Sequence, residues 1–392
     1  MNGVRTIIGV AHDPGGARAI LPVLMLLHEQ NVPVLAVVSG PAAEIAANEF
    51  ASLARLQMDD SSSLGSCVQE LERNACPALI SASGLYNRIE HTVRLAAREL
   101  GIPIVAVLDW WWFYKERFQR TLPDGPVEES LPDRVCAIDD FSREGLVEAG
   151  FPPEKIVVTG AANLESSSRR LKKYSAERDG IRAELGIGED GQCAVFFSEP
   201  YIRDSDGLPW GGTGGYFKDD GTAVFGYTSL EMLQEVAAAL IKKSPGATDL
   251  VLCVKPHPME HVPSLEIVIQ ACARSGLRIR LVRDTDPMKL IAAGDIFFGL
   301  ASIVLMEAGL TAKPVFSVQI GLDTNTTADP CVSNRLGFST PIYDRAALEA
   351  CVESWRQGKE TRGAPVNSDA WEGAASRIAE SVLDIVKTEN SI

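Results

Sequence analysis

The run Val251–Glu260, VLCVKPHPME, constrains the fold of this chain more than any other stretch. Its apolar first half predicts a buried strand, and the Lys255-Pro256-His257-Pro258 segment ends that strand. Two prolines in three residues remove backbone donors, so the chain cannot continue as a central strand and must leave the sheet. His257 is thereby expected at the carboxyl end of a strand, where open α/β sheets bind their ligands.

A second run, Phe297–Gln319, predicts a strand, a tight turn at Gly299, a helix and another strand. Ser302 falls at the expected helix start, where free N–H groups and the helix dipole favour an anion. Glu307 follows five residues later, about one and a half turns into the helix. We interpret His257, Ser302 and Glu307 as parts of a pocket for a nucleotide sugar.

Composition indicates a soluble globular protein of two domains, because 392 residues exceed the size of one typical domain. The longest apolar runs, such as Ile102–Leu108, are far shorter than a membrane span. The first sixteen residues lack the features of a signal peptide, so we expect a cytoplasmic protein.

A net charge of −15 argues against nucleic-acid and anionic-membrane surfaces. The eight cysteines are scattered without a C-x-x-C pair and are expected to be buried free thiols.

Strand–helix alternation occurs in two series, separated by a polar and charged stretch. We predict the α/β class, with two Rossmann-like parallel-sheet domains facing a central cleft. The first domain is expected at 1–165 and its connection to the second at 166–190. The second domain is expected at 191–365, followed by a helix at 366–392 that crosses back to the first domain. The glycine-rich stretch 201–227 is interpreted as a mobile lid, with an inert insertion as the alternative.

Candidate residues of the first domain follow two of its expected strands. Gly15 and Gly16 open a helix and would permit close approach of a ligand, although the G-x-G-x-x-G spacing is absent and a plain turn is the alternative. Asp13 precedes them, and Asp109 ends the apolar strand Ile102–Leu108. Either carboxylate could instead cap the helix that follows it.

Large aromatic residues come directly after Asp109, in the segment WWWFYKERFQR. Three consecutive tryptophans cannot all face one core, and so large an aromatic area is rarely left in water. We therefore place Trp110, Trp111, Tyr114 and Arg117 on the acceptor side of the cleft or at a subunit contact.

The KPHP segment followed by GLASIVLMEA resembles the C-terminal half of GT-B glycosyltransferases. The bacterial sialyltransferase, polysialyltransferase and capsule-polysaccharide enzymes are the most similar types, with CDP-glycerol glycerophosphotransferases and UDP-GlcNAc 2-epimerases more distant. The resemblance implies a general base at Asp109, with Asp13 as the alternative, although the acidic-acidic-glycine motif of those enzymes is missing. It also implies that donor binding involves the residues Ser198, Glu199, Lys255, His257, Pro258, Gly299, Ser302 and Glu307.

These residues lead to a functional expectation. The chain is expected to be a metal-independent, inverting glycosyltransferase without a cofactor, which uses a CMP- or UDP-linked sugar and a small-molecule or glycan acceptor. A sugar-nucleotide 2-epimerase or hydrolase, or a catalytically silent sugar-nucleotide-binding protein, is the alternative. A homodimer is a further possible state.

Overall fold

The computed structural model divides the chain into two compact units. The first contains 1–166 and 368–392, and the second contains 167–367. The structure describes residues 4–85, 87–121, 125–199, 228–258, 260–322, 324–325, 329, 331–359 and 371–389. The expected lid at 201–227 lies outside the described residues.

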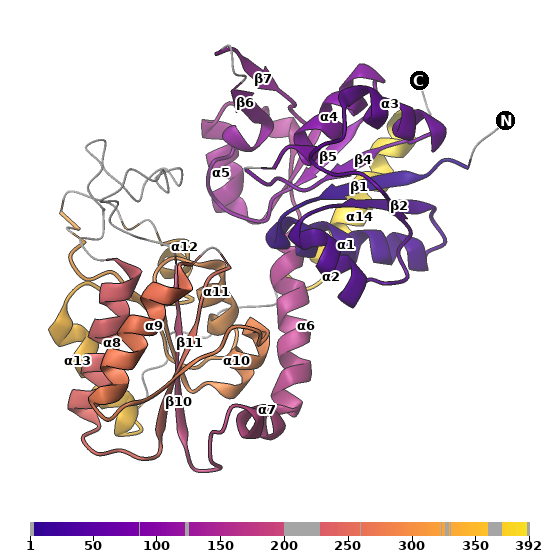
Figure 1. The fold of residues 1–392 in the computed structure, drawn as a ribbon. Helices are drawn as coiled ribbons and strands as arrows, with labels where there is room; N and C mark the ends of the chain where they lie inside the picture. The colour runs from indigo at the N-terminus through magenta and orange to yellow at the C-terminus, as the bar shows by residue number, and fades with distance from the viewer. Residues whose placement is uncertain are drawn as a thin grey trace. The chain divides into compact units, whose positions relative to one another are not determined.

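The first unit alternates strands and helices along the chain, as the sequence predicts (Figure 1). Its strands are β1 (Ile7–Ala11), β2 (Val34–Val38), β3 (Arg55–Leu56), β4 (Leu79–Ser81), β5 (Ile104–Val107), β6 (Gln119–Thr121), β7 (Val127–Glu129), β8 (Arg134–Ala137) and β9 (Ile156–Val158). Its helices are α1 (Pro14–Glu29), α2 (Pro41–Glu49), α3 (Leu64–Arg73), α4 (Ile89–Glu99), η1 (Glu116–Phe118), α5 (Asp140–Glu148), η2 (Pro153–Lys155), the start of α6 (Ala162–Ala176) and α14 (Ala374–Glu389).

Seven of these strands form one sheet in the order β3-β2-β1-β4-β5-β8-β9, and every pairing in it is parallel. Strand order reverses between β1 and β4, so the loops after these neighbouring strands diverge and leave room at their carboxyl ends. The strand predicted at Ile102–Leu108 is β5, which is fully buried as a central parallel strand should be. The remaining pair, β6 and β7, forms a separate antiparallel hairpin.

The C-terminal helix α14 belongs to the first unit, although it is distant in sequence (Figure 1). Its apolar face, with Ile378 and Val382, joins the core formed by Ile20 and Leu24 of α1. Glu165 accepts hydrogen bonds from the backbone N–H groups of Gly373 and Ala375, which secures the start of this helix.

The second unit repeats the architecture with a six-stranded parallel sheet in the order β12-β11-β10-β13-β14-β15. Its strands are β10 (Gln192–Phe197), β11 (Leu250–Lys255), β12 (Arg278–Leu281), β13 (Ile296–Gly299), β14 (Val315–Val318) and β15 (Thr340–Ile342). Its helices are the remainder of α6, α7 (Arg178–Glu184), α8 (Ser229–Lys243), α9 (Val262–Arg274), α10 (Pro287–Ala293), α11 (Ile303–Gly309), α12 (Val332–Arg335) and α13 (Arg345–Arg356).

Strand order in this sheet reverses between β10 and β13, which again marks an edge where ligands can bind. The stretch expected as a connection, 166–190, lies almost entirely within the second unit. Leu171 of α6, Ile181 of α7 and Leu185 directly after α7 pack into the core of that unit.

Candidate functional sites at the carboxyl ends of the two sheets

The first candidate site lies where the strand order of the first sheet reverses. The loop after β1 supplies His12 and Asp13, the loop after β4 supplies Ser83, and the segment after β5 supplies Asp109. Parallel strands bring these segments to one edge of the sheet, although they are far apart in sequence. The site therefore gathers polar side chains from the ends of three strands.

Asp109 is held by a buried arginine. Its Oδ1 lies 3.0 Å from Nη1 of Arg117 and accepts a hydrogen bond from Oγ of Ser83 at 3.4 Å. Only 14% of the Asp109 side chain is exposed. Burial raises the pKa of Asp109, the Arg117 guanidinium opposes this effect, and the nearby Asp13 carboxylate raises the pKa further. The two aspartates are thus electrostatically coupled.

Asp13 is the more exposed carboxylate of the site, with 39% of its side chain accessible. Its Oδ1 lies 2.9 Å from Nδ1 of His12, and its Oδ2 accepts from Nδ2 of Asn87 at 3.4 Å. The other ring nitrogen of His12 lies 3.6 Å from Oδ2 of Asp60. Although Asp13 is the N-cap residue of α1, its side chain makes no capping hydrogen bond. The helix-cap alternative therefore does not account for this carboxylate.

Gly15 and Gly16 lie directly against other parts of the first unit. A Cβ at position 15 would lie 2.3 Å from Oδ2 of Asp109, and one at position 16 would lie 2.6 Å from Cβ of Ala82. The protein itself occupies the room that these glycines create. Their role is to let α1 start directly against the ends of β4 and β5.

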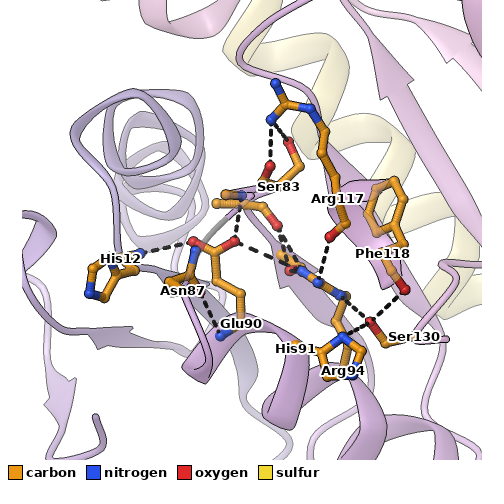
Figure 2. Close-up of polar contacts among 12 residues, drawn as sticks. His12, Ser83, Asn87, Glu90, His91, Arg94, Arg117, Phe118 and Ser130 are labelled. Atoms are coloured by element: carbon orange, nitrogen blue, oxygen red, sulfur yellow. Dashed lines mark hydrogen bonds and ion pairs between the residues drawn. The ribbon is translucent and has the colours of Figure 1, made fainter. Parts of the chain in front are cut away.

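Beneath this edge, α4 contributes a fully buried carboxylate, Glu90 (Figure 2). Its two oxygens accept from the backbone N–H groups of His12 at 2.9 Å and Gly84 at 2.7 Å. Nη1 of Arg94 lies 3.9 Å away on the next helical turn. Burial raises the pKa of Glu90 to about 7, with Arg94 opposing the shift. Glu90 thus ties the loop after β1 to the loop after β4.

Arg94 continues this buried network (Figure 2). Its Nε donates to Oγ of Ser130 at 3.0 Å, and its Nη2 donates to the carbonyl of Arg117 at 3.0 Å. Oγ of Ser130 lies 2.9 Å from Nδ1 of His91, whose Nε2 lies 3.0 Å from Oε2 of Glu128. Burial lowers the pKa of His91, which favours the neutral imidazole. The network fixes the hairpin that carries Glu128 to α4.

Trp111 and Tyr114 belong to the core of the first unit, which corrects their assignment to an acceptor surface. Trp111 is completely buried and its Nε1 donates to Oδ2 of Asp139 at 2.7 Å. Tyr114 is buried against Gly145, and Arg117 is buried with Asp109. Trp110 is half-buried and meets Trp111 edge to face at 5.8 Å between ring centres. The first unit therefore absorbs most of this aromatic area into its own core.

The second candidate site lies at the matching edge of the second sheet, after β10, β11 and β13. Glu199 is buried there, and its Oε1 accepts from the backbone N–H groups of Leu300, Ala301 and Ser302 at 3.3, 2.8 and 2.7 Å. Ser302 is the N-cap of α11, and its Oγ accepts from the N–H of Val304. The sequence-based prediction placed a phosphate of the nucleotide at this turn, and in the structure a carboxylate lies there. This carboxylate is the protein's own, so these donors are already used.

His257 follows β11, as its prolines predict, and is half-buried. Its backbone N–H donates to Oγ of Ser198 at 3.2 Å, which links the ends of β11 and β10. Burial lowers the pKa of the His257 imidazole. Glu260 comes one turn later and is buried with its Oε2 unbonded, and burial raises its pKa to about 7. Ser198, His257 and Glu260 therefore form one cluster.

The other predicted donor-site residues have structural contacts of their own. Nζ of Lys255 donates a hydrogen bond to the carbonyl of Arg283. Pro258 differs from the others in that it is exposed to solvent. Gly299 lets Leu305 of α11 pack closely, since a Cβ there would lie 3.0 Å from Cδ2 of that residue. Oε1 of Glu307 accepts from Oγ of Ser167 at 2.6 Å, so this oxygen is occupied.

The sequence analysis did not single out several residues of the candidate sites: His12, Ser83, Glu90, Arg94 and Glu260. Glu90 and Arg94 carry the spacing of an exposed helical ion pair, so only their position on a helix covered by other elements reveals their burial. Glu260 ends the motif that contains His257, and this adjacency was the available signal. Within the described ranges, no cluster of histidine, cysteine, aspartate or glutamate side chains could hold a metal ion.

Comparison with known proteins identifies the fold. No family model matches the sequence, and neither does any curated protein. Among solved structures, the chain resembles UDP-GlcNAc 2-epimerase from Neisseria meningitidis bound to UDP-GlcNAc, with a TM-score of 0.65, 14% identity, and coverage of 97% of this chain and 100% of that chain. It also resembles a glycosyltransferase from Rickettsia africae, with a TM-score of 0.57, 13% identity, and coverage of 100% and 97%. An Anabaena protein in complex with UDP and glucose has a TM-score of 0.55, 15% identity, and coverage of 99% and 100%.

These likenesses extend over nearly the whole chain and confirm the predicted fold class, two parallel-sheet α/β units of the GT-B type. None of the helices in the described ranges has the length and apolar content needed to cross a bilayer.

Proposed function

We propose that this protein is an enzyme that transfers the sugar of a nucleotide sugar to an acceptor hydroxyl group. The observation that carries the proposal is that Asp13 follows β1 and Asp109 follows β5, beside the point where the first sheet reverses its strand order, with Asp109 held by Arg117. A carboxylate with a raised pKa and partial exposure suits the removal of a proton from a hydroxyl group. The likeness to proteins whose structures hold UDP-GlcNAc, or UDP and glucose, supports a nucleotide sugar as the donor.

The reaction assigns a role to each residue. The acceptor oxygen forms the new bond to the anomeric carbon while its proton passes to Asp109. The bond from that carbon to the phosphate oxygen breaks, and the nucleotide leaves with the electron pair. We assign binding of the nucleotide to the cluster of Ser198 and His257 in the second unit. The imidazole donates a hydrogen bond to the departing phosphate oxygen, which is worth about 10²–10⁴-fold if the proton is transferred. Asp13, paired with His12, orients the acceptor.

The alternative is a 2-epimerase or hydrolase acting on the nucleotide sugar. The specific observation in its favour is the likeness to the Neisseria enzyme across 97% of this chain. Such an enzyme needs no acceptor, because it reacts with the sugar of the donor or with water. The two functions therefore differ in whether an acceptor is required.

The decisive experiment incubates the full-length protein with a panel of UDP- and CMP-linked sugars in D₂O, with and without a mixture of sugar acceptors. Nuclear magnetic resonance spectra report nucleotide release, the configuration at C2 and deuterium incorporation. Release that depends on the acceptor, with a new glycosidic linkage, is the result expected for a transferase. Inversion at C2 with deuterium uptake, or release without an acceptor, would establish the alternative. Binding without any turnover would contradict both.

In this assay, Asp140→Asn is the matched control for Asp109→Asn, because Asp140 is an exposed aspartate of the first unit. His257→Asn tests the role in the second unit. We expect this variant to lose turnover, while the backbone N–H of residue 257 can still donate to Ser198.

A further inference from the structure

A small cationic pocket lies in the first unit, on the side of α4 that faces the hairpin. It has a volume of about 130 Å³. Its lining includes Asn87, Arg88, His91, Arg94, Arg117 and Arg120, and the described lining residues include no acidic side chain. Four arginines at one small cavity are unusual in a chain with a net charge of −15. The pocket is therefore a local positive site on an acidic protein.

Two of the four arginines are engaged in the core. All three nitrogens of the Arg94 guanidinium donate to Ser130, Ser81, Ala82 or Arg117. Arg117 pairs with Asp109 through Nη1, but its Nη2 makes no hydrogen bond to a described residue. A donor remains available there beside the proposed base.

The other two arginines of the pocket are Arg88 and Arg120. Within the described part of the chain, the side chains of Arg88 and Arg120 have neither an ion-pair nor a hydrogen-bond partner. Glu128 lies opposite Arg120 on the hairpin, but its Oε2 is bound to His91. An arginine guanidinium is a planar fork that matches carboxylate and phosphate groups.

The size of the pocket limits what it can hold. A volume of about 130 Å³ corresponds to roughly four water molecules at ~30 Å³ each. Pockets for whole small molecules begin at ~300 Å³. The pocket therefore suits one phosphate or carboxylate group, and the remainder of the ligand lies outside it.

The pocket also borders the candidate active site. Asn87, which lines it, donates to Oδ2 of Asp13 at 3.4 Å, and Arg117 lies 3.0 Å from Oδ1 of Asp109. We propose that this pocket binds an anionic group, phosphate or carboxylate, of the acceptor, so that the acceptor is an acidic molecule. The identification of the bound molecule as the acceptor rests on the proposed function, whereas the binding of an anion rests on the pocket alone.

The test uses inorganic phosphate and acetate as probes, titrated by calorimetry into the full-length protein at low ionic strength. The double variant Arg88→Gln/Arg120→Gln is compared with Arg55→Gln/Arg73→Gln, which removes the same charge from exposed positions elsewhere in this unit. We expect the first pair to raise the Kd of at least one probe by ~10-fold or more, because the anion loses charge-assisted hydrogen bonds. The control pair should leave the Kd within about twofold. Melting temperatures verify that all variants fold.

Three outcomes would overturn the proposal: no binding of either probe by the parent protein, equal weakening by both double variants, or displacement of phosphate by UDP. The last result would assign the pocket to the donor. Stronger binding of phosphate than acetate identifies a phosphorylated acceptor, and the reverse identifies a carboxylate. If phosphate binding depends on Arg88 and Arg120 but no nucleotide sugar reacts, the pocket stands and the proposed function fails.

Discussion

Nη1 of Arg117 lies 3.0 Å from Oδ1 of Asp109, and both side chains are largely buried. Burial raises the pKa of Asp109, and the ion pair with Arg117 opposes this shift. Arg117 itself is fixed through Nε by the carbonyl of Trp112. The aromatic segment therefore acts by holding the arginine that controls the proposed base.

Removal of the Arg117 charge should move the acidic limb of the pH–rate profile to higher pH. In Arg117→Gln, burial and the Asp13 carboxylate act on the pKa of Asp109 without opposition, so the base is protonated over a wider range. Arg117→Lys keeps the charge and should keep the limb near its original pH. The measurement is kcat/KM from pH 4 to 8. Equal profiles for the two variants would contradict this role.

The two aspartates should differ in their kinetic effects. We expect Asp109→Asn to lower kcat by ~10²–10⁴-fold, because it removes the proton acceptor while the geometry is retained. Asp13→Asn should mainly raise KM for the acceptor, since Asp13 is the more exposed group. Steady-state kinetics with a saturating donor separate the two effects. A near-parental kcat in Asp109→Asn, with kcat lost in Asp13→Asn, would reverse the assignment.

Gly15→Ala should impair activity more than stability. Its Cβ would lie 2.3 Å from Oδ2 of Asp109, so the carboxylate must move. Gly65→Ala is the matched control, because this helical glycine has no heavy atom within 4 Å of an added Cβ. We expect the control to be neutral or stabilised by up to ~1 kcal/mol. Turnover and urea unfolding of both variants measure the contrast, and unchanged kcat in Gly15→Ala would refute it.

Glu90 should make the protein less stable as the pH rises from about 4.5 to 7. Its pKa is about 7 in the folded protein and ordinarily 4.5, so in this window the folded state retains a proton that the unfolded state releases. The contribution of Glu90 to the free energy of unfolding is fully present below pH 4.5. It falls by up to about 3 kcal/mol as the pH rises through 7.

Glu90→Gln should remove this dependence, because the amide does not titrate. The difference in the free energy of unfolding between parent and variant should therefore shrink as pH rises, as measured by urea unfolding from pH 4.5 to 8. Glu72→Gln, an exposed change on α3, serves as the control. A constant difference across this range would show that Glu90 stays ionised.

Glu199→Ala should destabilise the second unit by ~1–3 kcal/mol, because it leaves three N–H groups at the start of α11 without their acceptor. Glu199→Gln retains one carbonyl oxygen and should lose less. Chemical unfolding of both variants measures the effect. Equal stability of Glu199→Ala and the parent would mean that the bonds to Oε1 contribute nothing.

The sequence by itself determined the fold class and the places where the strands end. Apolar runs of strand length, stopped by proline or glycine, predict β5, β11 and β13, and the carboxyl end of each carries a predicted site residue: Asp109, His257 and Ser302. These are local properties of the chain, since the backbone rules for proline and the length of an apolar run do not depend on distant residues.

Only the tertiary structure decided which polar groups face one another. Glu90 and Arg94 have the spacing of a solvent-exposed pair, yet the loop after β1 and the hairpin bury them. Glu199 occupies the turn expected to hold a phosphate, 101 residues or more along the chain from its donors. Such contacts depend on strand order and helix packing, which bring distant segments together, and burial then sets the charge and the partners of each group.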